Sequence, residues 1–235
     1  SIKGIWCVPK YSNPQGITYS DETVRRFARM KTAADDFMIM WDNAYAVHDL
    51  HPEHRDTLIN ILDECKKAGD PNRVMIFAST SKITYAGAGI AVFACAQEVM
   101  ERMKKLLTIQ TIGFDKMNML RHARYFKNID GIMAHMDKQA ELLRPKFKTV
   151  LDAFERELGG KGVAEWINPN GGYFISLNVM DGCAKRVVQL CKDAGVVLTS
   201  AGSTYPYGDD PHDRNIRIAP TYPSIPELEC AVSLL

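Results

Sequence analysis

Short apolar runs alternate with longer polar stretches in the first third of the chain. The runs GIWCVP (residues 4–9), DFMIMW (36–41) and RVMIFA (73–78) are apolar at consecutive positions and are bounded by turn residues. This pattern is typical of strands that are buried on both faces of a parallel sheet. A fourth apolar run, GIAVFACA, covers residues 89–96.

The polar stretches between these runs have the spacing of amphipathic helices. Residues 21–34 begin at a capping residue, either Ser20 or Asp21. Residues 52–69 end at Gly69, a residue that commonly terminates helices. Alternating strands and helices predict a doubly wound α/β sheet.

The pattern changes in the second half of the chain. The expected elements are, in chain order, helices at 97–109, 113–126 and 131–158, a strand at 172–179, a helix at 182–194, strands at 195–200 and 215–220, and a helix from 226. Pro145 is an expected kink in the longest helix. We place a domain boundary near residue 130, which divides the chain into residues 1–130 and a smaller α+β domain at 131–235.

Composition narrows the classes of function. The chain has 29 basic and 28 acidic side chains, a balance that gives no electrostatic footprint for nucleic acid or an anionic membrane. Six cysteines without a CxxC pair fit reduced thiols in a cytoplasmic protein. The longest uncharged run, residues 83–97, falls short of the roughly 20 apolar residues that cross a bilayer. We therefore expect a cytoplasmic protein without nucleic-acid or membrane partners.

Polar side chains follow each of the first three apolar runs. KYSNPQG (residues 10–16) follows the first run, DNAY (42–45) the second and STSK (79–82) the third. Ligands of open α/β sheets bind at the carboxyl ends of the strands. We therefore expect these three segments to converge on one crevice.

Lys82 stands between hydroxyl residues and a segment rich in glycine and alanine, and its nearest charged neighbours along the chain are Arg73 and Glu98. The free amine of a lysine in such surroundings forms an imine with an aldehyde. Pyridoxal phosphate (PLP) is an aldehyde of this kind. It also needs a carboxylate at its ring nitrogen, donors at its phenolate oxygen and hydroxyls at its phosphate. The three strand-end segments contain all of these groups.

Five segments together resemble a known family. SNPQG, DNAY and STSK, in this order, resemble class I/II aminotransferases of PLP fold type I. NPNGGYFISL (168–177) and NIRIAP (215–220) resemble the small domain of that family. The segments KITYAGAG and TIGFDKMNMLRHARYF are most similar to a bacterial branch of aspartate aminotransferases. The resemblance covers the whole chain and implies a three-layer α/β fold. Residues 1–130 would be part of the PLP-binding large domain, with a mostly parallel sheet.

The resemblance implies how the cofactor is held. Lys82 would bond covalently to the cofactor aldehyde and would shuttle a proton between the substrate Cα and the cofactor. Asp42 would pair with the ring nitrogen. Asn13 and Tyr45 would donate hydrogen bonds to the phenolate oxygen.

The resemblance also implies how anionic groups are bound. Ser79 and Ser81 would hold the cofactor phosphate. Arg217, together with Asn13, would bind the substrate, its guanidinium gripping the α-carboxylate as a two-pronged donor. Arg214 is the nearest competitor for that role.

The chain departs from the family in two places. Members often carry a phosphate-binding arginine shortly after the lysine, whereas AGAGIA contains no cation. The family's upstream region, with its glycine-rich phosphate turn, its ring-stacking aromatic and the arm that contacts a partner subunit, is not in this sequence. We therefore expect a fragment of a homodimeric enzyme that is inactive by itself.

The expected function is PLP-dependent transfer of an amino group between aspartate and 2-oxoglutarate. One alternative is a non-catalytic PLP-binding sensor domain of an aminotransferase-like transcription regulator. Decarboxylation or β-elimination on the same fold is another alternative. His48, His51 and His54 favour a loop and a helix start beside Pro52 over a metal site, and no metal is expected.

Overall fold

The computed structural model describes residues 1–235, which pack into two compact units. Unit 1 consists of Ser1–Lys10, Thr18–Val47 and Asp56–Met136, and unit 2 consists of Tyr11–Ile17, His48–Arg55 and Asp137–Leu235. The units reflect packing alone. The domain boundary near residue 130 stays a prediction.

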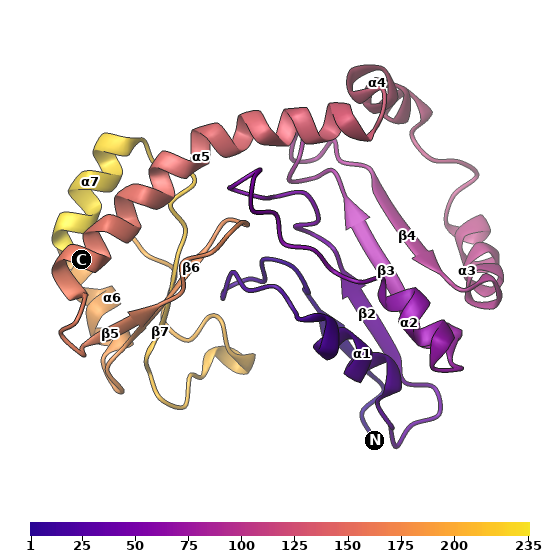
Figure 1. The fold of residues 1–235 in the computed structure, drawn as a ribbon, viewed down its shortest axis with the longest axis horizontal. Coiled ribbons are helices and arrows are strands. Elements are labelled where there is room, and N and C mark those ends of the chain that lie inside the picture. The colour runs from indigo at the N-terminus through magenta and orange to yellow at the C-terminus, as the bar shows by residue number, and fades with distance from the viewer. The chain divides into compact units, whose positions relative to one another are not determined.

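Unit 1 is built on a four-stranded sheet with the order β1-β2-β3-β4 (Figure 1). The strands are β1 (Gly4–Cys7), β2 (Met38–Asp42), β3 (Val74–Ser79) and β4 (Ala91–Cys95). The first three are parallel, as their apolar runs predict, and β4 runs antiparallel to β3. Cys7 pairs with Trp41, and Asp42 pairs with Phe77. The carboxyl ends of the three parallel strands therefore lie at the same end of the sheet.

One face of this sheet packs on helices α1 (Asp21–Arg29) and α2 (Ile61–Lys67). The core cluster consists of Cys7, Val24, Ala28, Ala34, Phe37, Ile39, Trp41, Ile61, Cys65 and Val74. Burial of each large apolar side chain stabilises the fold by about 1.5–3 kcal/mol. Ser20 caps α1 because its side chain accepts a hydrogen bond from the Thr23 N–H, which confirms Ser20 as the start of that helix.

The prediction of a helix at residues 52–69 is wrong for the first half of that range. The His54 N–H donates to the His51 carbonyl at 2.9 Å in a turn, and α2 begins only after Asn60, whose side chain accepts from the Leu62 N–H. The expected helix start beside Pro52 is therefore replaced by a turn. A short 3-10 helix, η1 (Pro71–Arg73), follows α2 and leads into β3.

Three helices follow β4, in the order α3 (Gln97–Gln110), α4 (Lys116–Phe126) and α5 (Ile129–Leu158). Asp115 caps α4 by accepting a hydrogen bond from the Asn118 N–H at 2.9 Å. Helix α5 is continuous through Pro145. Ile83, Phe126 and Met136 form a small apolar cluster of unit 1.

Unit 2 contains an antiparallel sheet of order β5-β6-β7 with helices packed on it (Figure 1). Its elements are β5 (Ala164–Trp166), β6 (Ile175–Val179), α6 (Ala184–Asp193), the 3-10 helix η2 (Pro206–Gly208), β7 (Asn215–Ile218) and α7 (Ile225–Leu234). The core cluster is made of Leu50, Phe147, Val150, Phe154, Ile175, Leu177, Ala184, Ile216, Ile218 and Leu228. Helices on one antiparallel sheet agree with the predicted α+β composition.

Two details of unit 2 differ from the prediction. Residues 195–200 form no strand, because the Val196 N–H donates to the Cys191 carbonyl at 2.7 Å and so completes the end of α6. Leu198 instead packs against the apolar core. Strand β5 was not predicted, since its three residues, AEW, are too few to show an alternating pattern.

Candidate functional site

Lys82 lies in a single turn that directly follows β3 in unit 1. The N–H groups of Ile83 and Thr84 both donate to the Thr80 carbonyl at 2.9 Å, which closes one helical turn. The Lys82 ammonium lies 5.4 Å from the centroid of the Tyr45 ring. The structure therefore brings together two of the predicted cofactor residues.

Asp42 is the last residue of β2, and a tryptophan side chain holds its carboxylate. Trp6 Nε1 donates a hydrogen bond to Asp42 Oδ2 at 3.2 Å. The Trp6 ring stacks on Phe77, with 5.9 Å between ring centroids and 9° between planes. Trp6 was not among the site residues predicted from the sequence. Its signal was the period of two in β1, which points Cys7 into the core and Trp6, 61% exposed, to the other face.

Ser79 and Ser81 belong to the same tight structure. Ser79 Oγ accepts a hydrogen bond from the Ser81 N–H at 3.4 Å. The Thr80 N–H donates to the Ile90 carbonyl at 2.9 Å, so the segment after the lysine folds back on the turn. Gly89 permits this approach, because a Cβ there would lie 2.4 Å from Ser81 Oγ. The AGAGIA segment thus forms a wall of the Lys82 turn.

Arg217 and Asn13 meet in unit 2. Arg217 Nη1 donates to Asn13 Oδ1 at 3.1 Å, and Nη2 lies 3.5 Å from Thr199 Oγ1. The guanidinium carbon lies 4.8 Å from the centroid of the Phe174 ring. Arg217 Nε is buried without a hydrogen-bond partner, and Arg217 makes no ion pair within residues 1–235. Its charge is therefore not neutralised by a carboxylate of this chain.

The segment that carries Asn13 is anchored by a buried tyrosine. Tyr11 is fully buried, and its hydroxyl donates to Asp49 Oδ1 at 2.6 Å. A Cβ on Gly171 would lie 2.2 Å from Tyr11 Cε2, so the glycine-rich turn NPNGG packs directly on the ring. The Gly172 N–H donates to the His48 carbonyl at 2.9 Å. These contacts fix the start of the segment that places Asn13.

The predicted site residues fall into two groups. Unit 1 carries Asp42, Tyr45, Ser79, Ser81 and Lys82, and unit 2 carries Asn13 and Arg217. Contacts join Lys82 with Tyr45, Ser79 with Ser81, and Asn13 with Arg217. The Asp42 carboxylate contacts Trp6 instead.

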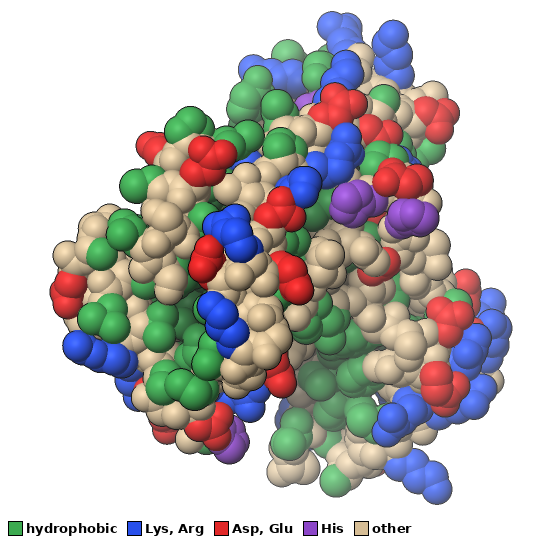
Figure 2. Space-filling view, turned by 60° about the vertical axis from the view of Figure 1, so that its left-hand side comes forward, with side chains coloured by type: hydrophobic (Ala, Val, Ile, Leu, Met, Phe, Trp, Pro, Cys, Tyr) green, Lys and Arg blue, Asp and Glu red, His purple; other side chains and the backbone are tan.

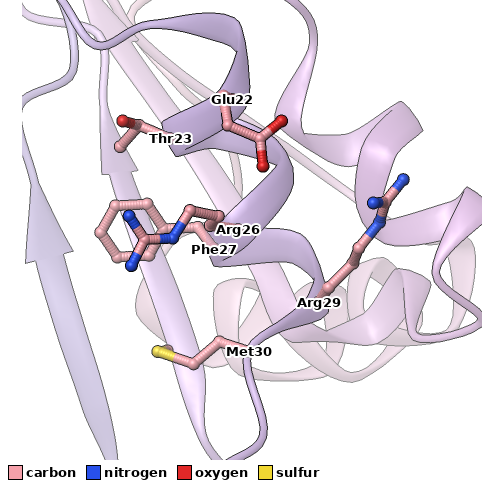
Figure 3. A pocket seen from close by; sticks show the side chains of 6 residues that line it. All are labelled: Glu22, Thr23, Arg26, Phe27, Arg29 and Met30. Atoms are coloured by element: carbon pink, nitrogen blue, oxygen red, sulfur yellow. The ribbon is translucent and has the colours of Figure 1, made fainter.

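A cavity of about 590 Å³ lies beside α1 (Figure 3). It is lined by Glu22, Thr23, Arg26, Phe27, Arg29 and Met30. All six residues belong to one helix and its C-cap, and none is a predicted site residue. In Figure 3 the Arg29 side chain points away from Phe27 and Met30, so the lining charges do not converge on one point. We assign no function to this cavity.

Charges of both signs are intermingled on the face drawn in Figure 2, as the net charge of +1 leads one to expect. Among residues 1–235, no helix combines the length and the apolar character needed to span a membrane. No group of three or more histidine, cysteine or acidic side chains is arranged to hold a metal ion.

Comparison with known proteins decides the family. The model of the family described as aspartate amino-transferase matches residues 1–235. The chain belongs to the aspartate aminotransferase family. This membership confirms the resemblance expected from the strand-end segments.

Relatives of high identity cover nearly the whole chain. A Mycolicibacterium smegmatis protein named as an aminotransferase is 50% identical over 232 residues, which are 99% of this chain and 54% of the relative. An aspartate aminotransferase of Corynebacterium glutamicum is 47% identical over 231 residues, 98% of this chain and 53% of the relative. The chain thus spans about half the length of the curated relatives it matches.

Solved structures confirm the fold. A crystal structure of an aspartate transaminase from Corynebacterium glutamicum has a TM-score of 0.95 at 47% identity and covers 98% of this chain and 54% of its own. A Pyrococcus horikoshii kynurenine aminotransferase has a TM-score of 0.79 at 21% identity, with coverages of 98% and 54%, and supports the fold alone. The predicted α/β class and fold type I are confirmed.

Proposed function

We propose that the protein is a PLP-dependent aminotransferase that moves an amino group between aspartate and 2-oxoglutarate. The observation that carries the proposal is the position of Lys82. In a chain that the family model matches over residues 1–235, Lys82 follows β3, and its ammonium lies 5.4 Å from the centroid of the Tyr45 ring. Aspartate as the amino donor is supported by the Corynebacterium glutamicum relative, an aspartate aminotransferase that is 47% identical. The relatives named above are aminotransferases, and none is a transcription regulator.

The chemistry of the residues in unit 1 fits PLP. Lys82 offers an amine for the aldehyde, Asp42 a carboxylate for the ring nitrogen, and Tyr45 a phenol for the phenolate oxygen. Ser79 and Ser81 offer hydroxyls for the phosphate. The pairing of β2 with β3 supports placing Asp42 near the serines, because Asp42 pairs with Phe77, two residues before Ser79 on β3. Asn13 is proposed as a second donor to the phenolate oxygen.

Each residue has a distinct task in this proposal. PLP, when bound, supplies an electron sink for bonds at the Cα of an amino acid. The Lys82 amine holds the cofactor and then carries the proton to and from the substrate Cα. The Asp42 carboxylate, oriented by the Trp6 N–H, keeps the ring nitrogen protonated by opposing its positive charge.

Arg217 is proposed as the residue that binds the α-carboxylate. A planar guanidinium recognises a carboxylate through two parallel hydrogen bonds. Arg217 has a buried Nε without a partner and no ion pair, whereas Arg214 lies 3.6 Å from Glu165 and 3.7 Å from Asp181. The unneutralised guanidinium favours Arg217 over its competitor.

The proposal also includes a homodimer in the cytoplasm. The dimer is what the family resemblance implies. The six cysteines are free thiols, which is the usual state in a reducing compartment.

A single-turnover experiment tests the proposed reaction. The protein is loaded with PLP and mixed with aspartate whose amino nitrogen is isotopically labelled, and labelled pyridoxamine phosphate is measured by mass spectrometry. In a full-length protein that contains this chain, we expect labelled product from the wild-type sequence and a loss of at least about a hundredfold in rate in Lys82→Ala, because the proton carrier is removed. The 235-residue chain by itself is expected to give no product. Lys116→Ala, on the surface of α4, is the matched control.

Equal rates in the wild type and Lys82→Ala would overturn the proposal. Release of alanine from aspartate without labelled pyridoxamine phosphate would replace it by decarboxylation. Because the chain spans about half the length of its relatives, the experiment is done on a full-length protein that contains it.

A further inference from the structure

Helix α4 contacts both sides of the Lys82 turn. His122 Nδ1 lies 2.9 Å from the Asn118 carbonyl oxygen, which can only accept a hydrogen bond. Nδ1 therefore carries the proton, and in the neutral ring Nε2 is an acceptor. Nε2 lies 2.9 Å from Thr80 Oγ1 and 3.2 Å from Thr84 Oγ1. One histidine ring thus contacts the residues two positions before and two positions after the lysine.

The hydroxyl hydrogens of the two threonines have defined acceptors. Thr84 Oγ1 donates to the Thr80 carbonyl at 3.1 Å. Thr80 Oγ1 accepts from the Ile90 N–H at 2.9 Å, which leaves its own hydrogen for His122 Nε2. The ring therefore joins the turn to the segment that folds back on it.

The spacing of these residues sets the direction of Lys82. In one helical turn, positions four apart lie on the same side, and the residue midway between them lies on the opposite side. Thr80 and Thr84 face His122, so Lys82 faces away from it, toward Tyr45. Ile83 is 7% exposed, and its carbonyl lies 2.9 Å from His135 Nε2 of α5. Two histidines thus hold the backbone of the turn.

A second residue of α4 holds the segment after the lysine. Asn118 Nδ2 donates to the Ala88 carbonyl at 2.8 Å. Asn118 and His122 are four residues apart and therefore share one face of α4. We name these two residues the α4 clamp. The clamp grips the turn through His122 and the AGAGIA segment through Asn118.

We propose that the α4 clamp is a positioning device for Lys82. His122 fixes the backbone of the turn and thereby holds the Lys82 amine in the position that cofactor attachment requires. This inference rests on the proposed role of Lys82. His122 acts through Thr80 and Thr84 rather than by contact with the reacting amine.

The test uses the cofactor-free protein and a graded set of variants. His122→Ala removes the ring. His122→Gln retains a side-chain oxygen that can accept from the Thr80 hydroxyl. Arg124→Ala changes an exposed residue of the same helix and is the control. Amide hydrogen exchange is measured across residues 80–90. We expect about tenfold faster exchange of that segment in His122→Ala, and values near wild type in the other two variants.

The second measurement is the rate at which borohydride fixes PLP on the peptide that contains Lys82. We expect His122→Ala to slow fixation about tenfold, because the Lys82 amine is no longer held in a single position. His122→Gln should recover most of the rate. A rate in His122→Ala equal to that of the wild type would overturn the inference, whether or not exchange increases.

The two proposals fail in different ways. A wild-type protein in which PLP is fixed on a different lysine contradicts the proposed function, and with it the positioning role of His122 for cofactor attachment. Faster exchange across the whole sheet of unit 1 would show that His122→Ala no longer folds. The decision then passes to Thr80→Val, which keeps the shape of the side chain and removes the hydroxyl that donates to His122 Nε2. Unchanged exchange and fixation in that variant would overturn the inference.

Discussion

Two arginines three positions apart meet different electrostatic surroundings. Arg214, just before β7, lies within 4 Å of two carboxylates, those of Glu165 at 3.6 Å and Asp181 at 3.7 Å. Arg217, within β7, meets only a neutral amide, a hydroxyl and an aromatic face. A guanidinium whose charge is not matched inside the protein is suited to an anionic ligand.

The first prediction concerns Arg217→Ala. Loss of a two-pronged contact to a carboxylate costs about 2–4 kcal/mol, so the Kd for aspartate should rise about 30- to 900-fold. Titration calorimetry of the PLP-loaded protein measures the change. Arg214→Ala is the control and should bind aspartate as the wild type does. An unchanged Kd in Arg217→Ala, with a loss in Arg214→Ala, would reassign the carboxylate to Arg214.

Asp42 gives the second prediction. In Asp42→Ala, borohydride should still fix PLP on Lys82, because attachment needs only the amine. Single-turnover amino transfer should slow by about two to three orders of magnitude, since the opposing charge at the ring nitrogen is lost. Trp6→Phe, which keeps a ring against Phe77 but removes the N–H donor, should slow transfer less than tenfold. Near-normal transfer in Asp42→Ala would rule out its role.

At the scale of elements, strong local signals were predictive and tertiary contacts decided the rest. The apolar runs located β1, β2 and β3, because strands buried on both faces need continuous apolar sequence. The helix expected from residue 52 was displaced by the Asn60 cap, since a side-chain oxygen on the Leu62 N–H marks a new helix start. The apolar run at 195–200 contributes to the core without joining a ladder.

The close contact between the glycine-rich turn and Tyr11 gives a stability prediction. In Gly171→Ala, the new Cβ would lie 2.2 Å from Tyr11 Cε2 and 2.4 Å from the His48 carbonyl oxygen. Overpacking of this kind costs about 1–3 kcal/mol of unfolding free energy. Urea unfolding measures the loss, and Gly113→Ala, with no atom within 4 Å of its Cβ, is the control. Equal midpoints for the two variants would refute the packing described for Tyr11.

The turn before β7 gives a prediction about pH. Asp210 is 3% exposed; burial raises the pKa of its carboxyl, but the N–H groups of Asn215, Arg214 and His212 outweigh burial and leave the pKa lowered. A pKa lowered in the folded state stabilises the fold above the unfolded pKa of about 3.9, and this stabilisation is lost as pH falls through the folded pKa.

Asp210→Asn should therefore unfold at a lower urea concentration than the wild type at neutral pH. The corresponding loss of unfolding free energy is about 1–2 kcal/mol. The gap should narrow as the pH falls below about 4, where the wild-type carboxyl also becomes protonated. Urea midpoints measured across this range check the sign. A gap that is constant or widens in acid would show that the Asp210 charge does not stabilise the turn.

At the scale of the whole molecule, the strand-end segments were enough to predict the family, and the supporting contacts were not. Lys82, Asp42 and Tyr45 were proposed as site residues because each lies at or shortly after the end of a strand of the same sheet. The contacts of His122 with Thr80 and Thr84 join residues 42 and 38 positions apart, and a local pattern carries no information about such pairs. Trp6 was read only as part of an apolar run. Its hydrogen bond to Asp42 spans 36 positions, so the local sequence does not indicate it.

The covalent attachment of PLP to Lys82 is the assignment on which the proposed function depends most. The measurement is borohydride reduction of the PLP-loaded protein, followed by proteolysis and mass spectrometry of the modified peptides. We predict one dominant modified lysine, Lys82, in the peptide that contains STSK. Modification of a different lysine, or an even spread over the surface lysines, would contradict it.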